Sequence, residues 1–572
     1  MNVIEYLIKN LENLGITDVF GVAGDYNFDI LYAIKNNPKI KFYNCTNELN
    51  AGYAADGYAR QKGYGALVTT YGVGELSAIN AIAGAMAENV PIFNIVGAPS
   101  TNAQKAKKVL HHTIENQSFQ IFENSFEPIV ETTAFLNRDN AKMEIDRLLK
   151  VFVKEKKPVY LAIPSDIALM EISAKCVDYF WSSNVDTLNL AVEKILNKIN
   201  KAYKPVILAD ILIKRYDSVL EFKEFVEKSA IPVTNLLMGA NIVDYDCKTY
   251  LGGYFAEFEN PLAEKYINNM DCLISIGVIY SDLNSCGNKI PFDLKSHIYI
   301  AGNYTVVENE RFENIKMQDV LNELSKKIEP KEFQVEKLDI GYNTPTSIQQ
   351  EFNSEYIYAR LQEFLKDNDN FIVETGTAIQ GVAKMKFSKN VNIFTQNLWA
   401  SIGWATPATL GVCVAASDKR TILVTGDGAH QMTAMELGTI LRYNFKPIII
   451  VINNDGYLTE RLLCINDNDE FNNINKLNYS KFSRTFESDI WSTRVNNSDD
   501  FDKALRVTQI MDKLCYIEVC TKKDDSPELS KKILGSFNKY KNPSQKSSSD
   551  IKIKEESSFN YSTTIHESLR ED

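Results

Sequence analysis

Short apolar runs alternate with helix-length stretches along most of this chain of 572 residues, and this alternation limits the folds open to it. The apolar runs at 18–24, 91–96 and 158–163 are examples, and each ends in glycine, proline or polar residues. Strands that are separated by helices pair in parallel, with helices on both faces of the sheet. The sequence therefore predicts an α/β fold of the doubly wound type, in which ligands bind beyond the carboxyl ends of the strands.

The same alternation recurs in three blocks, which predicts three consecutive doubly wound parallel-sheet domains. We expect an N-terminal domain over 1–178, a central domain over 188–326 and a C-terminal domain over 351–540. The segment 327–350, rich in Lys, Glu, Pro and Thr, lacks sustained periodicity and is expected to be a linker. The segment 541–572 is rich in Ser, Lys and Glu, so we expect a disordered tail that cannot bury enough apolar surface to fold.

Charge and cysteine usage exclude several classes of protein. With 62 Lys and Arg against 74 Asp and Glu, the formal charge is −12, and no basic block is present. Neither nucleic acid nor an anionic membrane surface is therefore an expected partner. The longest aliphatic run, 448–452, is far shorter than the roughly 20 residues of a membrane helix. The nine cysteines are scattered without a C-x-x-C pair and no targeting segment is recognised, so a cytoplasmic location is expected.

Two motifs in the last block point to a specific ligand. Gly426-Asp427-Gly428 follows a predicted strand, and a helix is expected by Thr433, while Asn453-Asn454 ends the next predicted strand. A Gly-Asp-Gly tripeptide alone is usually a turn, but here Asp427 and Asn454 can reach one point at the carboxyl edge of adjacent strands. Hard oxygen ligands of this kind, with a backbone carbonyl, suit a Mg²⁺ ion that is bound to a diphosphate. The spacing therefore predicts a metal and diphosphate site.

In this pairing the chain resembles the thiamine-diphosphate-dependent enzymes, whose diphosphate motif is Gly-Asp-Gly followed by Asn-Asn at a similar distance. The resemblance implies that thiamine diphosphate and Mg²⁺ are the cofactors. It further implies that the metal is held by Asp427, Asn454 and the carbonyl of Gly456. The other cofactor contacts that it implies are Thr375, Thr377, Gly426, Gly428 and Ala429 for the diphosphate, and Ala400 and Ile402 for the aminopyrimidine. Ala400 departs from the family pattern, which usually has glycine there.

A further part of the resemblance lies in the first block. Glu48 follows the predicted strand 41–45 and opens a helix of small residues, where a carboxylate could simply favour the helix dipole. The segment 47–60 is similar to that of the family, which implies that Glu48 hydrogen-bonds the pyrimidine ring and promotes deprotonation of thiazolium C2. Because Glu48 and Asp427 stand in separate domains, the resemblance implies a site shared between two subunits. A homodimer is the expected minimum and a homotetramer the expected assembly.

Four polar residues indicate which reaction is expected. His111 and His112 precede Thr113, and histidine, with a pKa of about 6.5, suits proton transfer near neutral pH. This segment resembles the non-oxidative 2-oxo acid decarboxylases, which also use an aspartate like Asp25 and a glutamate like Glu460. The resemblance implies that a 2-oxo acid is converted to an aldehyde and CO₂. The implied proton relay, which would titrate as a coupled unit, consists of Asp25, His111, His112 and Glu460.

The choice of substrate stays open on the sequence alone. The resemblance places Ile379, Gln380 and Thr459 at the substrate side, and pyruvate, indolepyruvate or phenylpyruvate, and a branched-chain 2-oxo acid all remain candidates. The alternatives are a carboligase of the acetolactate type and a catalytically silent binding or assembly homologue, and the intact motifs argue against both. His430 follows the Gly-Asp-Gly motif where relatives mostly carry Leu, Ala or a similar residue. We expect it to pack behind the residues that touch the cofactor, and contact with the substrate or the diphosphate is the alternative.

Overall fold

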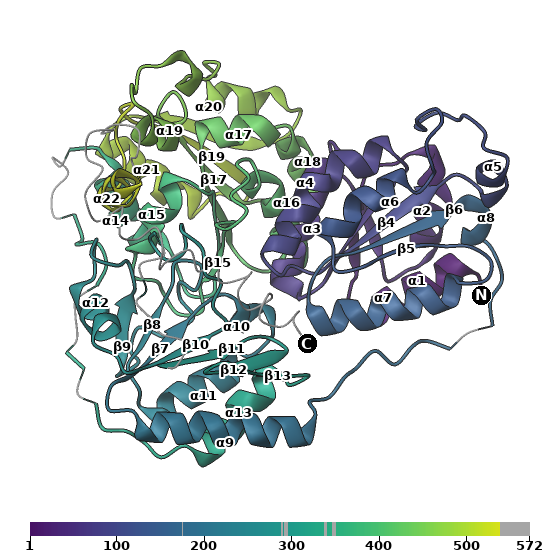
Figure 1. The fold of residues 1–572 in the computed structure, drawn as a ribbon. Coiled ribbons are helices and arrows are strands. Elements are labelled where there is room, and N and C mark those ends of the chain that lie inside the picture. Colours follow the sequence, from purple (N-terminus) through teal and green to yellow (C-terminus); the bar gives the residue numbers. More distant parts are fainter. Residues whose placement is uncertain are drawn as a thin grey trace.

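Three α/β domains, each built around one sheet, make up the computed structural model of the chain (Figure 1). The structure describes residues 1–173, 175–287, 290, 296–333, 335–336, 340–345 and 351–537. The predicted tail, 541–572, and part of the predicted linker, 327–350, lie outside the described residues. The predicted α/β fold with three parallel-sheet domains is confirmed, whereas the residue boundaries given above for the domains stay predictions.

The N-terminal domain holds a parallel sheet with strand order β2-β1-β3-β4-β6-β5. Its strands are β1 (Asp18–Gly21), β2 (Lys41–Asn44), β3 (Gly65–Thr70), β4 (Ile92–Ala98), β5 (Thr133–Phe135) and β6 (Val159–Pro164). One face is covered by α1 (Val3–Asn13), α2 (Phe28–Asn36) and α7 (Ala141–Glu155). The other is covered by α3 (Glu48–Lys62), α4 (Val73–Ala87) and α6 (Ile121–Phe126). Every residue of β3, β4 and β6 is buried, which explains why these strands are mostly apolar and show no alternation of apolar and polar residues.

The central domain extends its parallel sheet with two antiparallel strands, in the order β13-β12-β11-β10-β7-β8-β9. Its strands are β7 (Pro205–Ala209), β8 (Val233–Asn235), β9 (Tyr250–Gly253), β10 (Cys272–Ile276), β11 (His297–Ile300), β12 (Tyr304–Val307) and β13 (Glu310–Glu313). Its longer helices are α9 (Val185–Lys201), α11 (Val219–Ser229), α12 (Pro261–Asn268) and α13 (Met317–Lys327). Helices α9, α11 and α13 cover one face, whereas the other face shares its apolar core with the C-terminal domain.

The C-terminal domain has a parallel sheet with strand order β15-β14-β16-β17-β19-β18. Its strands are β14 (Asn370–Val373), β15 (Asn392–Phe394), β16 (Thr421–Gly426), β17 (Ile448–Asn453), β18 (Ile490–Val495) and β19 (Leu514–Cys520). Its helices are α14 (Ser354–Phe364), α15 (Thr377–Ala383), α16 (Ala405–Ala415), α17 (Asp427–Thr433), α18 (Glu436–Arg442), α19 (Leu458–Leu463), α20 (Tyr479–Phe482), α21 (Ser498–Thr508) and α22 (Glu528–Ser536). The helix expected by Thr433 begins as early as Asp427, because the chain turns into it directly at the end of β16.

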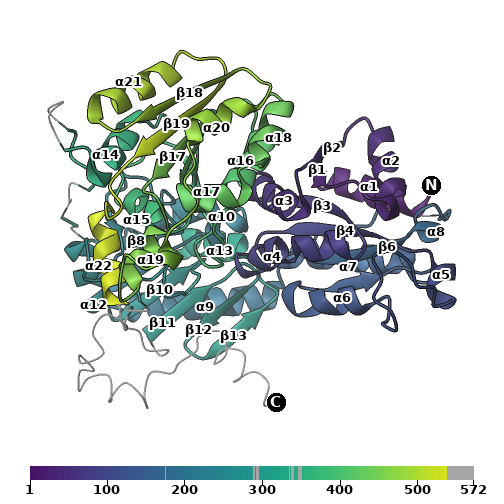
Figure 2. The ribbon, with the colours of Figure 1, turned by 90° about the horizontal axis from the view of Figure 1, so that it is seen from above.

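Helices α3 and α16 join the N-terminal and C-terminal domains, and they lie side by side in both views (Figures 1 and 2). Their backbones approach closely, since a Cβ atom at Gly411 would lie 1.9 Å from the carbonyl oxygen of Ala54. Polar contacts add to this packing, because the Trp404 indole donates to Asp56 at 2.7 Å and the Arg60 guanidinium donates to the Thr395 carbonyl at 2.7 Å. The segment that precedes α16, which contains Ile402, is thereby fixed against the N-terminal domain.

The structure shows the state of the cysteines and whether any helix could span a membrane. All nine cysteines are free thiols, and five of them are buried, namely Cys45, Cys272, Cys286, Cys413 and Cys515. Within the described ranges, every helix lacks the length and apolar composition needed to cross a membrane.

Candidate active site

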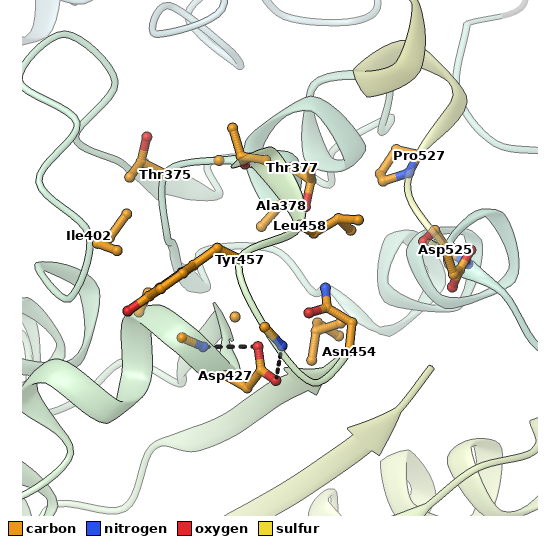
Figure 3. A pocket seen from close by; sticks show the side chains of 18 of the residues that line it. Thr375, Thr377, Ala378, Ile402, Asp427, Asn454, Tyr457, Leu458, Asp525 and Pro527 are labelled. Atoms are coloured by element: carbon orange, nitrogen blue, oxygen red, sulfur yellow. Dashed lines mark hydrogen bonds between the residues drawn. The ribbon is translucent and has the colours of Figure 1, made fainter. Parts of the chain in front are cut away.

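A cavity opens at the carboxyl ends of β16 and β17 (Figure 3). These strands are neighbours, with Gly426 paired with Ile452, so the residues that follow them meet at one edge of the sheet. Most of the predicted site residues line the cavity, namely Thr375, Thr377, Ile402, Gly426, Asp427, Gly428, Ala429, Asn454, Gly456 and Glu460. Further lining residues, which the sequence did not single out, include Ser354, Ile357, Tyr358, Asp525 and Pro527. They stand far from the motifs along the chain, and no local pattern marks them.

The predicted metal ligands form a set of oxygen donors. The Asp427 carboxylate is buried and accepts hydrogen bonds from the amides of Gly428 at 2.9 Å and Gly456 at 3.2 Å (Figure 3). Burial raises the pKa of Asp427 to about 6. The side-chain oxygen of Asn454 is buried without a hydrogen-bond partner among the described residues. A buried carboxylate beside an unsatisfied amide oxygen suits a hard cation such as Mg²⁺, so the residues fit the implied metal.

Arg461 holds the loop that carries these ligands. It is 5% exposed, and its guanidinium donates to the carbonyl oxygens of Asn454 at 3.0 Å and Asp455 at 2.5 Å. Gly456 has a φ of 149°, and a Cβ atom there would lie 2.1 Å from Nη2 of Arg461 and 2.3 Å from the carbonyl oxygen of Asn472. The loop therefore requires glycine at position 456, on grounds of both backbone conformation and space.

Glu374 is a buried carboxylate behind the cavity. It directly follows β14, and its Oε2 accepts from the amides of Gly403 at 3.2 Å and Ala405 at 3.3 Å and from the Thr425 hydroxyl at 3.4 Å. Burial raises its pKa to about 7, although the hydrogen bonds oppose that shift. Glu374 thus ties together segments from three parts of the chain that carry predicted cofactor contacts. The one signal in the sequence was a charged residue at the end of an apolar strand.

Three members of the predicted relay meet in the N-terminal domain. Asp25 opens the short 3-10 helix η1 (Asp25–Asn27) after β1, and its Oδ2 lies 2.7 Å from Nε2 of His111. The His111 ring stacks on Tyr26 with 4.8 Å between centroids, and the His112 ring meets it edge-on at 4.7 Å. Asp25 and His111 are about half exposed. The structure therefore brings together side chains that are 86 residues apart in sequence.

Within one chain, the predicted site residues fall into two groups. Every residue that lines the cavity at Asp427 belongs to the C-terminal domain, in the part of the chain that the structure describes. Glu48 lies instead at the start of α3, where Asn47 caps the helix by accepting from the Asn50 amide at 2.8 Å. The Asp25 and histidine cluster likewise belongs to the N-terminal domain, which forms a separate lobe in both views (Figures 1 and 2).

The remaining predicted residues are placed as follows. Thr459 lines the cavity, whereas Ile379 and Gln380 are buried in α15 and are absent from its wall. Ala400 has a φ of 53°, a conformation that suits the glycine usual in the family. His430 is buried behind the cavity, with its ring nitrogens 2.9 Å from the hydroxyls of Thr406 and Tyr516.

Comparisons with known proteins agree with this geometry. The chain matches three family models, described as the N-terminal TPP binding domain, the central domain and the C-terminal TPP binding domain of thiamine pyrophosphate enzymes. The matches cover residues 1–121, 192–323 and 374–519. The two TPP binding models thus fall on the two domains that hold the predicted site residues.

Curated relatives span nearly the whole chain. A pyruvate decarboxylase from Kluyveromyces lactis is 32% identical over 539 residues, which are 91% of this chain and 96% of that protein. Pyruvate decarboxylase isozyme 1 of Saccharomyces cerevisiae is 32% identical over 541 residues, 92% of this chain and 96% of its own length. A putative pyruvate decarboxylase of Schizosaccharomyces pombe is 37% identical over 478 residues, 80% of this chain and 84% of that protein.

Proposed function

The chain belongs to the thiamine pyrophosphate-dependent 2-oxo acid decarboxylases, and from this premise we propose which residues hold the cofactors, which move protons and which acid is used. The overall reaction consumes one proton, because a 2-oxo acid anion and H⁺ give an aldehyde and CO₂. Bound thiamine diphosphate supplies the electron sink for cleavage of the carbon–carbon bond. The protein must bind the cofactor, orient the acid and deliver the proton.

In our proposal the C-terminal cavity holds the metal and the diphosphate. The observation that carries it is the unsatisfied oxygen of Asn454 beside the buried carboxylate of Asp427. These two groups and the carbonyl of Gly456 would hold Mg²⁺. The diphosphate would lie against Thr375, Thr377, Gly426, Gly428 and Ala429.

In the same proposal, groups from the N-terminal and the C-terminal domain transfer protons. Glu460 lines the cavity and would exchange a proton with the substrate. The carboxylate of Asp25 holds the His111 ring through its Nε2 atom, and the ring of Tyr26 fixes the plane of that imidazole. His111 and His112 would then hold or donate the proton that the aldehyde carbon gains.

We further propose that a second copy of the chain completes each site. The cavity at Asp427, including Glu460, has walls from the C-terminal domain, whereas Glu48 and the cluster of Asp25, His111 and His112 belong to the N-terminal domain. Contact of the N-terminal domain of one copy with the cavity of another would bring Glu48 and the Asp25 and histidine cluster of the first copy to the cofactor, while Ile402 and Ala400 come from the chain that holds the diphosphate. A homodimer is then the smallest active unit, and a homotetramer would be a pair of such dimers.

Pyruvate is the substrate we propose. Two of the relatives that are similar to this chain over nine-tenths of its length are named pyruvate decarboxylases. The test is an assay of aldehyde formation coupled to NADH oxidation, with thiamine diphosphate and Mg²⁺, over a panel of aliphatic, branched and aromatic 2-oxo acids. We expect the highest kcat/KM with pyruvate. A larger kcat/KM for an aromatic or branched acid would contradict the proposal that pyruvate is the preferred substrate. Formation of acetolactate in place of acetaldehyde would indicate a carboligase.

A further inference from the structure

A set of metal-ligating side chains lies outside the Mg²⁺ site, in the N-terminal domain. One carboxylate and two imidazoles, from Asp25, His111 and His112, each offer a ligand atom, and these atoms all lie within 4.8 Å of one another. Two histidines and one carboxylate are a donor set typical of zinc and related transition metals. Magnesium prefers oxygen ligands throughout, so this triad and the Asp427 site differ in the ions that they favour.

The triad is held in place before any ion binds. The His111 ring is stacked on Tyr26 at 11° between ring planes, and the His112 ring packs against the His111 ring. The Thr113 hydroxyl donates to the Leu110 carbonyl at 2.6 Å and accepts from the Leu110 amide at 3.1 Å, which closes the turn that carries both histidines. The two imidazoles are therefore partly ordered before an ion binds, which lowers the entropy cost of binding.

We propose that Asp25, His111 and His112 form a binding site for a transition-metal ion of the zinc class, with water completing the coordination. Zinc bonds of about 2.0 Å place neighbouring tetrahedral ligand atoms about 3.3 Å apart. On binding, the 2.7 Å hydrogen bond between Asp25 and His111 must therefore open by roughly half an ångström, and ligand atoms that lie up to 4.8 Å apart must close by up to about 1.5 Å. Asp25 and His111 are about half exposed, so their side chains have the freedom to make this shift.

Binding of a metal ion to the triad does not depend on the proposed function. Its expected effect on activity does rest on the proposed function. An ion on the triad occupies the imidazole lone pairs that the proposed relay uses. Zinc should then inhibit decarboxylation while Mg²⁺ and thiamine diphosphate remain bound. The site would make the enzyme sensitive to free zinc in a way that added magnesium does not reverse.

The test uses the full-length protein with saturating thiamine diphosphate and Mg²⁺, titrated with Co²⁺ as a coloured substitute for zinc and with Zn²⁺ by calorimetry. We expect one site per chain with a cobalt spectrum of nitrogen and oxygen ligation. The substitutions Asp25→Asn, His111→Gln and His112→Gln should each lower the affinity by at least about tenfold. Asp29→Asn, a carboxylate on α2 outside the triad, is the matched control and should leave the affinity unchanged.

Several results would overturn the site. Co²⁺ affinity that is unchanged in all three triad variants excludes it, as does a spectrum of thiolate ligation, which would assign the ion to cysteine. Binding that is lost only in Asp427→Asn would mean that cobalt had replaced magnesium. Zinc that binds to the triad without inhibiting decarboxylation would support the metal site and contradict the proposed relay, so the two ideas fail separately.

Discussion

The carboxylate of Asp427 accepts a hydrogen bond from the backbone amide of Gly456, with 3.2 Å between Oδ2 and N. The two residues follow adjacent strands, β16 and β17, so this bond closes the two loops on one another at the carboxyl edge of the sheet. Arg461 packs behind the same glycine and binds the carbonyls of the loop. The geometry of the proposed metal site therefore depends on a residue without a side chain.

The substitution Gly456→Ala should weaken the binding of the cofactors. The new Cβ would lie 2.1 Å from Arg461 and 2.3 Å from a backbone oxygen, at a φ that side chains rarely adopt. We expect the affinity for thiamine diphosphate with Mg²⁺, measured by calorimetry, to fall by more than about tenfold, equivalent to about 1.4 kcal/mol. Gly535→Ala is the control, because a Cβ at that position meets no atom within 4 Å. Affinity within twofold of the original protein would contradict the prediction.

Asp427→Asn should abolish stabilisation by the cofactors without destabilising the cofactor-free protein. Burial raises the pKa of this carboxyl to about 6, so at pH 7.5 the protein without a metal holds an unfavourable buried charge. The thermal midpoint without ligands should therefore be equal to or higher than that of the original chain. The increase in midpoint on adding thiamine diphosphate and Mg²⁺ should disappear. A midpoint several degrees lower before ligands are added would show that the carboxylate is structural.

Glu374→Gln should change how stability depends on pH. Burial raises the folded pKa of Glu374 to about 7 from an ordinary value of 4.5, so its contribution to stability is present below pH 4.5 and is lost as the pH rises to 7. Glutamine does not titrate, but it keeps an oxygen for the amides of Gly403 and Ala405. We expect the variant to gain stability relative to the original protein between pH 5 and pH 8. Thermal midpoints measured in parallel give the difference, and a difference that is constant with pH would contradict the assignment.

His430→Leu should also change how stability depends on pH, but its effect should appear as the pH falls below neutral. Burial lowers the pKa of His430 to about 4, so its contribution is complete above pH 6.5 and is lost as the pH falls towards 4. At pH 7.5 the variant leaves the hydroxyls of Thr406 and Tyr516 unpaired, at a cost of about 1–3 kcal/mol. Urea unfolding should show this deficit shrinking between pH 6.5 and pH 4.5. A deficit that grows towards acid would indicate that His430 is protonated in the native protein.

The local motifs of the site can be predicted from the sequence, whereas the groups that act through long-range contacts cannot. Asp427 and Asn454 were placed at adjacent strand ends because apolar runs and glycines mark strand ends directly. Glu374 was missed because its hydrogen-bond donors, at 403, 405 and 425, come from segments that only the folded sheet brings together. The pairing of Asp25 with His111 followed from a family resemblance, since no local pattern predicts a contact over 86 residues. The edge strands β12 and β13 were not predicted, because they form an antiparallel hairpin with no helix between them and so fall outside the strand–helix alternation.

Mixing two inactive variants tests whether the site is shared between copies. Glu460 lies in the C-terminal cavity and His111 in the N-terminal cluster, so Glu460→Gln and His111→Gln should each lose decarboxylation while cofactor binding is kept. If the domains of two copies form each site, a mixed dimer has one site with both residues intact and one with neither. Random pairing makes half the dimers mixed, so aldehyde formation should recover to about a quarter of that of the original protein.

The matched control mixes two variants of the same domain, Glu460→Gln with Asp427→Asn. Every site in any dimer of these chains contains one altered C-terminal domain, so no activity should return. Both mixtures are made by co-expression, and the rate of aldehyde formation is measured with cofactors in excess. Absence of recovery in the first mixture, with dimers present by light scattering, would mean that Glu460 and His111 of one chain act together. Recovery in the control would likewise contradict the division of the site. Both control substitutions lie in the C-terminal domain, so every site in a mixed dimer should carry one of them.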